Sequence, residues 1–149
     1  MHFSYREAAI TDIEALHKVR MSVKENVLNT PSLVKYEDYR DYLSTKGKGW
    51  LSEHEGTVVG FTILDTNSNW LWALFVNPAF EKKGIGKKLQ QLMLDWHFTQ
   101  NNTPLFLSTA PSTRADLFYT HSGWKRGEIL KNGEVKFEIS KQDWVIRSA

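Results

Sequence analysis

Apolar and polar positions along the chain change from the period of a strand to that of a helix. The run Trp70 to Val76 is almost wholly apolar and predicts a buried strand, while Leu89, Leu92, Met93 and Trp96 repeat at helical spacing. A glycine-containing turn separates the two segments. The centre of the chain therefore predicts a strand, a turn and a long amphipathic helix.

The same reading predicts six further strands and three further helices. The first helix begins at the capping-box sequence Thr11-Asp12-Ile13-Glu14 and keeps an apolar face as far as Val27. The sequence Lys46-Gly47-Lys48-Gly49 is expected to be a loop. The other expected strands are His2 to Ala8, Trp50 to His54, Thr57 to Asp65, Pro104 to Ala110, Trp124 to Lys131 and Glu134 to Ser140; the other expected helices are Tyr36 to Leu43 and a short one that Ser112 or Thr113 caps and Gly123 stops.

The order of these elements predicts one α+β domain over residues 1–149. Short turns join the strands between residues 50 and 76, which indicates an antiparallel meander, and Asn132-Gly133 indicates a terminal hairpin. The strand Pro104 to Ala110 follows a helix, so it is expected to lie parallel to Trp70 to Val76 through a right-handed crossover. We expect a central mixed, mostly antiparallel sheet of six to seven strands flanked by about four helices.

Composition narrows the class of protein. Hydrophobic residues make up 41% and charged residues 24% of the chain, which is typical of a soluble globular protein with no membrane span. The net charge of +2 is low for a nucleic-acid binder. With no cysteine there is no disulfide, thiolate metal site or cysteine nucleophile, and the histidines lack metal-ligand spacing. Charged residues interrupt the first twenty positions, which is unlike a signal peptide, so a cytoplasmic location is expected. No metal cofactor is expected.

Chemistry is concentrated in the turn Glu81 to Lys88. Two glycines, Gly84 and Gly86, precede a helix whose first amides are free to bind an anion, and four lysines add positive charge. The turn fits neither the P-loop pattern GxxxxGK followed by Ser or Thr nor the dinucleotide pattern GxGxxG. It predicts a site for a phosphate-bearing ligand, with an ordinary strand-to-helix turn as the alternative.

This turn resembles motif A of the GNAT N-acetyltransferases, which has the pattern R/Q-x-x-G-x-G/A. In that family the motif binds the pyrophosphate of acetyl coenzyme A. Gly84 and Gly86 match, whereas Glu81 replaces the basic or amide residue and is expected to point away. The resemblance implies the GNAT acyltransferase fold, with acetyl-CoA as cosubstrate. Its pantetheine arm would pair with backbone groups where the strand separates from its parallel neighbour. The implied cofactor-binding residues are Leu74, Phe75, Val76, Lys82, Lys83, Gly84, Ile85, Gly86, Lys87 and Lys88.

A second stretch resembles motif B of the same family, NxxAxxxYxxxG followed by Phe or Trp. Ala115, Tyr119, Gly123 and Trp124 match, and Ser112 stands at the asparagine position. The resemblance implies that Tyr119 protonates the departing thiolate and that Ser112 and Phe118 contact coenzyme A. A phenol has a pKa of about 10, so it carries its proton at neutral pH.

The family resemblance implies an enzyme that moves an acetyl group to a primary amine by direct attack in a ternary complex. Relatives often use a glutamate on the central strand as base, but Trp70 to Val76 has no acid. The base is a water relay or a carboxylate such as Glu25, Glu37 or Asp38.

Other functions and partners stay open at this stage. The alternatives are a catalytically silent acyl-CoA-binding regulatory domain and a nucleic-acid patch on the lysines, which the low charge disfavours. The acceptor, a small molecule or a peptide, is not identified, nor is the use of acyl groups larger than acetyl. Relatives often dimerise, so a homodimer is possible.

Overall fold

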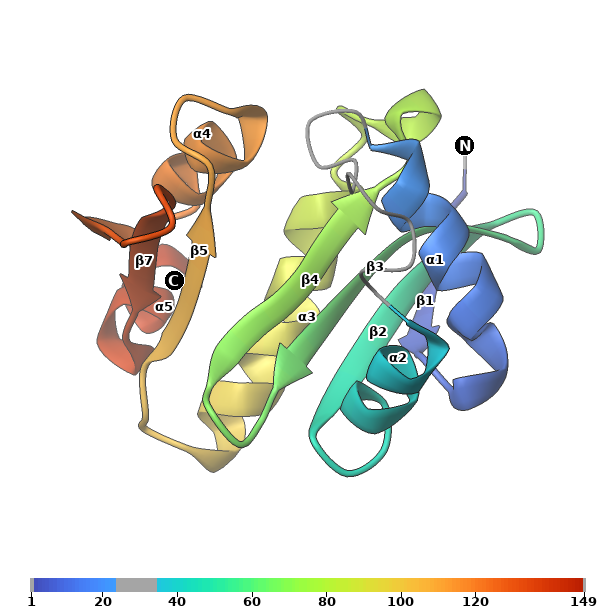
Figure 1. Cartoon of the computed structure of the whole chain (residues 1–149), viewed down its shortest axis with the longest axis horizontal. Coiled ribbons are helices and arrows are strands. Elements are labelled where there is room, and N and C mark those ends of the chain that lie inside the picture. The colour runs from blue at the N-terminus through green and yellow to red at the C-terminus, as the bar shows by residue number, and fades with distance from the viewer. Residues whose placement is uncertain (1, 24–34, 149) are drawn as a thin grey trace.

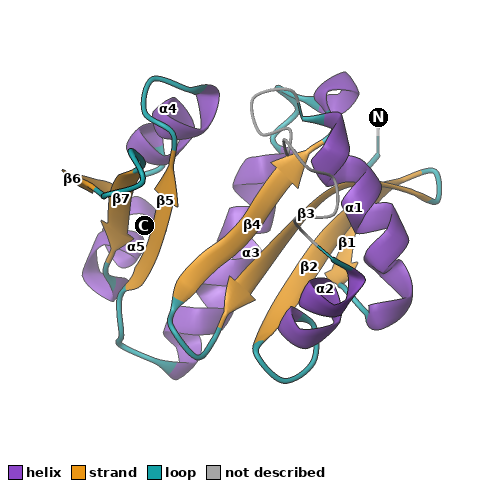
Figure 2. Ribbon diagram, in the orientation of Figure 1, coloured by secondary structure: helices purple, strands orange, loops and turns teal. Residues whose placement is uncertain are grey.

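The computed structural model describes residues 2–23 and 35–148. In this part of the chain seven strands form one sheet in the order β1-β2-β3-β4-β5-β7-β6 (Figures 1 and 2). The strands are β1 Ser4–Glu7, β2 Gly47–His54, β3 Thr57–Asp65, β4 Trp70–Val76, β5 Leu105–Thr109, β6 Lys125–Ile129 and β7 Val135–Ile139; the helices are α1 Ile13–Ser22, α2 Tyr36–Tyr42, α3 Ile85–Gln100, α4 Arg114–His121 and α5 Lys141–Ser148. Two 3-10 turns, η1 Ile10–Asp12 and η4 Pro78–Phe80, precede α1 and α3.

The predicted fold class is confirmed. Neighbouring strands are antiparallel throughout the described sheet except for β4 and β5, which are parallel. The helix α5 was not predicted from the sequence. Its residue Trp144 packs against the core and donates its indole N–H to the Asp95 carboxylate of α3 at 2.9 Å. The mixed sheet with helices on both faces is the expected α+β architecture.

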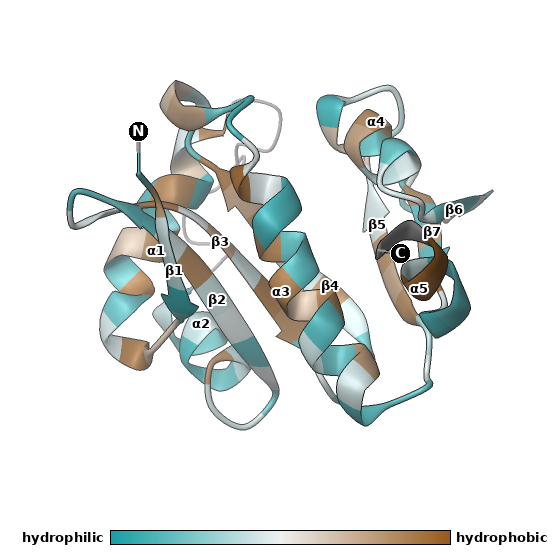
Figure 3. Cartoon of the chain, turned by 180° about the vertical axis from the view of Figure 1, so that it is seen from behind, coloured by the Kyte–Doolittle hydropathy of each residue, from teal (hydrophilic) through white to brown (hydrophobic). Residues whose placement is uncertain are grey.

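Each face of the sheet buries its own apolar cluster. α1 and α2 cover one face, where Leu16, Tyr39 and Phe61 are almost fully buried. α3 covers the other face, and its residues Leu89 and Met93, one helical turn apart, are fully buried against it. Figure 3 views this second face and shows hydrophilic and hydrophobic residues interleaved along α3. The two-layer burial fixes α3 behind β3 and β4.

A bulge changes which face the side chains of β4 occupy. Ile63 pairs with Ala73 but the next residue, Leu64, pairs with Leu71, so Trp72 is the extra residue on β4. Trp72 and Ala73 consequently both pack on the α1 and α2 face. The bulge places an aromatic side chain on that face where regular alternation would put it on the other.

β4 and β5 pair at one point only. The register contains the single pair Trp70 and Phe106, and the Phe106 N–H donates to the Asn69 carbonyl at 2.9 Å. Beyond this point the two strands diverge toward their C-terminal ends (Figure 1). The edge of β4 that faces β5 therefore has no strand partner from Leu71 to Val76.

Two sequence predictions about local structure are wrong. Residues 47–49 begin β2 instead of forming a loop. The end of α2 and the strand β3 come so close to positions 47 and 49 that only glycine fits there. A Cβ at Gly47 would lie 2.7 Å from the Tyr42 carbonyl oxygen and would also collide with that of Leu64. The capping box starts earlier than predicted, since Asp12 accepts from the Ala9 N–H at 2.8 Å. Val27 lies outside the described residues.

Candidate active site

The turn after β4 delivers a helix N-terminus with free amides. Gly84 has φ +82°, a left-handed conformation that costs glycine little, and α3 begins at the next residue. No side chain caps this helix, so its first-turn N–H groups are available to an anion. Ile85, the first residue of α3, is 1% exposed and packs into the α3 cluster.

Positive charge surrounds this turn. Lys82, Lys83, Lys87 and Lys88 are exposed, and none of them forms an ion pair with another residue in the described ranges. Lys82 itself adopts φ +62°, which turns the backbone sharply before Gly84. The four ammonium groups lie around the positive, N-terminal end of the α3 dipole, so both favour an anion at this turn.

Gly86 lies between β4 and α4. A Cβ built at Gly86 would meet the ring of Phe118 at 3.6 Å and the Val76 side chain at 3.7 Å, which are ordinary van der Waals distances. The fold thus brings the glycine turn, the end of β4 and α4 together. The other β4 residues of the predicted set divide between the two faces, with Leu74 against the α3 cluster and Phe75 against the α1 cluster.

An ion pair accounts for the acid at position 81. The Glu81 carboxylate bonds Nη1 of Arg114, the first residue of α4. The pair neutralises an acid that would otherwise oppose an anion at the turn. It also links the turn of motif A to the helix of motif B. Glu81 therefore differs from the residue of the family pattern, but its negative charge is compensated by Arg114.

The N-terminus of α4 is organised by Asp116, a residue that the sequence reading missed. Its carboxylate accepts from the Ser112 N–H at 2.9 Å and from Arg126 at 3.3 Å, and Thr113 caps the helix. Hydrogen bonds from Arg126 and from the Ser112 backbone lower the Asp116 pKa. The bond holds Ser112 at φ +64°, with its side chain exposed. The spacing of Thr113 and Asp116 is a capping signal that was available in the sequence.

Tyr119 is buried beside these elements. Its ring lies 5.2 Å from Phe118, 5.7 Å from Trp124 and 5.9 Å from Phe137, measured between ring centroids. Burial raises the pKa of its hydroxyl, which therefore stays protonated at neutral pH. Among the described residues that hydroxyl has no hydrogen-bond partner, so it is free to donate to a ligand.

The predicted bases are not brought to Tyr119. Glu37 is exposed, and Asp38 accepts from the Lys35 N–H at 2.8 Å at the start of α2. α2 covers β2 and β3, away from α4 (Figure 1). Glu25 lies outside the described residues.

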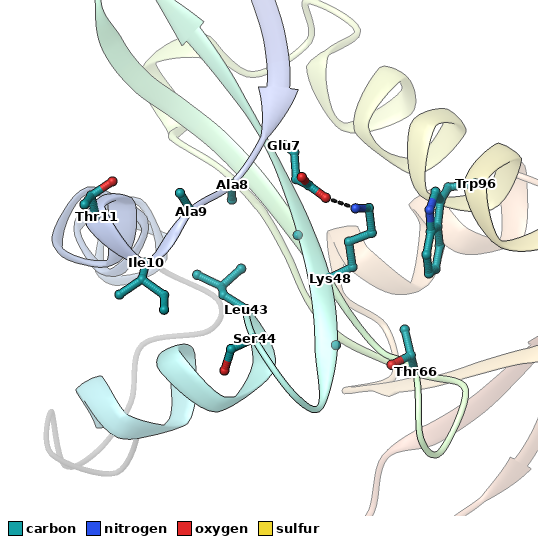
Figure 4. A pocket seen from close by; sticks show the side chains of 12 residues that line it. Glu7, Ala8, Ala9, Ile10, Thr11, Leu43, Ser44, Lys48, Thr66 and Trp96 are labelled. Carbon is teal, nitrogen blue, oxygen red and sulfur yellow. Dashed lines mark ion pairs between the residues drawn. The ribbon is translucent and has the colours of Figure 1, made fainter.

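A cavity of about 710 Å³ opens at the opposite end of the sheet (Figure 4). Glu7 and Lys48 form an ion pair across it, and the Lys48 ammonium lies 5.4 Å from the Trp96 ring centroid. None of the predicted cofactor residues lines this cavity. It is lined by Glu7, Ala8, Ala9, Ile10, Thr11, Leu43, Ser44, Gly47, Lys48, Gly49, Thr66 and Trp96.

Comparison with known proteins decides the family. The sequence model of the Acetyltransferase (GNAT) family matches residues 13–124, which include both motifs. The chain belongs to the GNAT acetyltransferase family. No curated protein matches the sequence. The GNAT assignment agrees with the order of strands and with the divergence of β4 from β5.

Solved GNAT structures share the fold at low sequence identity. PaiA N-acetyltransferase from Thermoplasma acidophilum, in complex with coenzyme A, is 18% identical with a TM-score of 0.80, covering 94% of this chain and 99% of that one. The streptothricin acetyltransferase described from Bacillus anthracis, in complex with acetyl coenzyme A, is 17% identical with a TM-score of 0.72, over 93% and 99%. The ribosomal-protein-S18-alanine N-acetyltransferase of Escherichia coli is 15% identical with a TM-score of 0.73, over 92% and 91%.

No helix in ranges 2–23 and 35–148 is long and apolar enough to cross a membrane. In the same ranges no three His, Asp or Glu side chains are grouped so that they could hold a metal ion.

Asp116→Asn should destabilise the fold by about 1–2 kcal/mol, because it weakens charge-assisted hydrogen bonds to Arg126 and Ser112. The folded-state pKa of Asp116 is lowered, so its contribution is present above its ordinary pKa of about 4 and is lost as the pH falls through the folded value. Urea unfolding at a series of pH values measures this. The control Asp41→Asn, in an exposed pair with Lys46, should change stability by less than about 0.5 kcal/mol. If the difference in unfolding free energy between the parent and Asp116→Asn were as large at pH 2 as at neutral pH, the role of the Asp116 carboxylate would be contradicted.

Proposed function

We propose that this protein transfers an acetyl group from acetyl coenzyme A to a primary amine, by direct attack of the amine in a ternary complex. The proposal is carried by one observation, the meeting of Gly86, Val76 and Phe118 at the uncapped N-terminus of α3. This places free amides, four lysines and the unpaired edge of β4 in one region. An anionic pyrophosphate and an amide-rich pantetheine chain match these two features.

The residues would divide the binding of acetyl coenzyme A between them. The first-turn amides of α3, with Gly84 and Gly86, would hold the pyrophosphate, and Lys82, Lys83, Lys87 and Lys88 would add charge. The backbone of Leu74, Phe75 and Val76 would pair with the pantetheine amides. Phe118 and Ser112 would contact the chain from the α4 side. The cosubstrate supplies the activated acetyl carbon of its thioester.

Tyr119 is the proposed general acid. The amine nitrogen forms a bond to the acetyl carbon as the carbon–sulfur bond breaks, and the Tyr119 hydroxyl gives its proton to the departing sulfur. Burial keeps this hydroxyl protonated, and the phenolate regains a proton from solvent after release. In the described part of the chain the candidate acids Glu37 and Asp38 lie on α2, away from α4, so the amine would lose its proton to water. The absence of cysteine excludes a cysteinyl acyl-enzyme.

The function is tested by incubating the protein with acetyl coenzyme A and a panel of amines while free thiol is followed. We expect at least one amine to give thiol release, and Tyr119→Phe to reduce kcat by about 10²- to 10⁴-fold with little change in KM for acetyl coenzyme A. The melting temperature should be unchanged, because the variant loses no hydrogen bond. Coenzyme A binding without thiol release for every amine would instead support a silent regulatory domain. A normal kcat in Tyr119→Phe, with chemistry rate-limiting, would remove Tyr119 from the mechanism.

Gly86→Asp tests the position of the pyrophosphate. A carboxylate in the first turn of α3 interacts favourably with the helix dipole, so the free protein should remain folded. Coenzyme A at 100 times its Kd stabilises the parent by about 2.7 kcal/mol, and Gly86→Asp should abolish this shift. Gly86→Ala is the matched control, since its methyl group fits at 3.6 Å from Phe118 and carries no charge. Equal stabilisation of the parent and Gly86→Asp by coenzyme A would show that the turn does not hold the pyrophosphate.

A further inference from the structure

A charged residue occupies a core position of α1. Arg20 is 9% exposed and lies on the same helical face as the buried Leu16 and Val19. Arginine is rarely buried to this degree unless it is paired. The other buried residues of α1, Ile13, Leu16 and Val19, are apolar.

Two aromatic rings of β4 hold the guanidinium. Its central carbon lies 5.1 Å from the Trp72 ring centroid and 4.9 Å from that of Phe75. Trp72 is the bulged residue and stacks on Tyr42 at 4.4 Å. The bulge therefore supplies part of the surface on which the guanidinium rests.

Two of the three guanidinium nitrogens lack hydrogen-bond acceptors among the described residues, and the third is the one left to interact with the Tyr39 hydroxyl. Nε and Nη1 of Arg20 are both buried and have no hydrogen-bond partner in the described part of the chain. Cation–π contact stabilises the charge from the ring faces but satisfies none of the N–H groups. Buried N–H donors without acceptors destabilise the free protein, so a movement of the guanidinium toward the oxygen acceptors of a ligand would be favourable.

The nearest titratable side chain on α1, within the described residues, is neutral. His17 shares a hydrogen bond of 2.8 Å with the Tyr39 hydroxyl, and burial, with the charge of Arg20, lowers the His17 pKa. The imidazole is thus neutral at pH 7. Among the described residues Arg20 is the one cation placed over Trp72 or Phe75. A single positive charge matches a carboxylate better than a phosphate dianion.

We propose that Arg20 binds a carboxylate of the acceptor, so that the substrate class is an amine that also carries a carboxylate, such as an amino acid. This rests on the proposed acetyl transfer. Phe75 adjoins Val76, whose side chain lies beside Gly86, so Arg20 lies near the end of β4 at which the acetyl donor would bind. α1 packs on β3 and β4 from the face opposite α3, so Arg20 would meet the acceptor from the α1 side of the open β4 edge. The guanidinium fork offers parallel donors to a planar carboxylate.

The test compares matched pairs of compounds, amino acids and their α-carboxamides, as acceptors with acetyl coenzyme A. The parent should favour the acid member. Arg20→Gln should lower kcat/KM for the acid about 10- to 100-fold and leave the amide unchanged, since charged hydrogen bonds carry that much discrimination. Lys18→Gln removes an exposed charge two residues away on the same helix and should change neither rate. An equal loss for acid and amide in Arg20→Gln, or a preference of the parent for amides or for O-phosphoethanolamine, would overturn the proposal.

A binding measurement separates this inference from the catalytic one. Thermal shifts are recorded for N-acetyl amino acids and their amides, with and without coenzyme A, on the parent, Arg20→Gln and Arg20→Met. The acid should raise the melting temperature of the parent alone, and Arg20→Met should fold at least as stably as the parent because it removes an unpaired buried charge. If the acid raised the melting temperature of both variants as well, the role of Arg20 would be contradicted. This outcome does not depend on coenzyme A binding or on acetyl transfer, so it is separate from a failure of the proposed function.

Discussion

β4 and β5 share the pair Trp70 and Phe106 and then separate, and the candidate site depends on this loss of pairing. An interior strand of a sheet normally has partners for the N–H and C=O groups on both edges. Here β3 holds one edge of β4 and the other is open from Leu71 onward. A ligand that carries amides can complete the sheet at this edge, in the manner of an added strand.

The elements around the open edge keep it from closing. α3 joins β4 to β5 as a crossover helix whose buried residues, Leu89 and Met93 among them, anchor it behind β3 and β4. On the far side α4 carries Phe118 to Gly86, and Arg114 to Glu81. The two strands are thus held apart by packed helices, and the helix that begins at the opening presents its positive end to it. Geometry and charge favour the same ligand, a long chain of amides that ends in phosphates.

Patterns with a short physical range were predictable from the sequence. The bounds of β3 and β4 were predicted to the residue, because both are apolar runs between turn signals, and the glycine turn identified the start of α3. Tertiary contacts decided the rest. Gly47 and Gly49 look like loop residues, but Tyr42 and Leu64 lie close to Gly47, and Leu43 and Ile63 lie close to Gly49. These contacts between distant segments explain their place in a strand.

Two further features of the site also depend on contacts between distant segments. The sequence does not reveal that Arg114 neutralises Glu81, or that a bulge turns Trp72 toward Arg20. The helical period of α1 places Arg20 on its buried face, yet a lone arginine in such a pattern is usually taken for a residue at the edge of the core. Its unpaired nitrogens become evident only when the aromatic side chains of β4 lie around it.

The central claim is that the open edge of β4 receives acetyl coenzyme A. Amide hydrogen exchange, recorded residue by residue with and without the cosubstrate, tests this most directly. Protection should increase at amides between Leu71 and Val76 and in the first turn of α3, while the amides that pair β2 with β3 change little. Binding of acetyl coenzyme A with no added protection at β4, or with protection confined to the cavity around Lys48 and Trp96, would contradict the account.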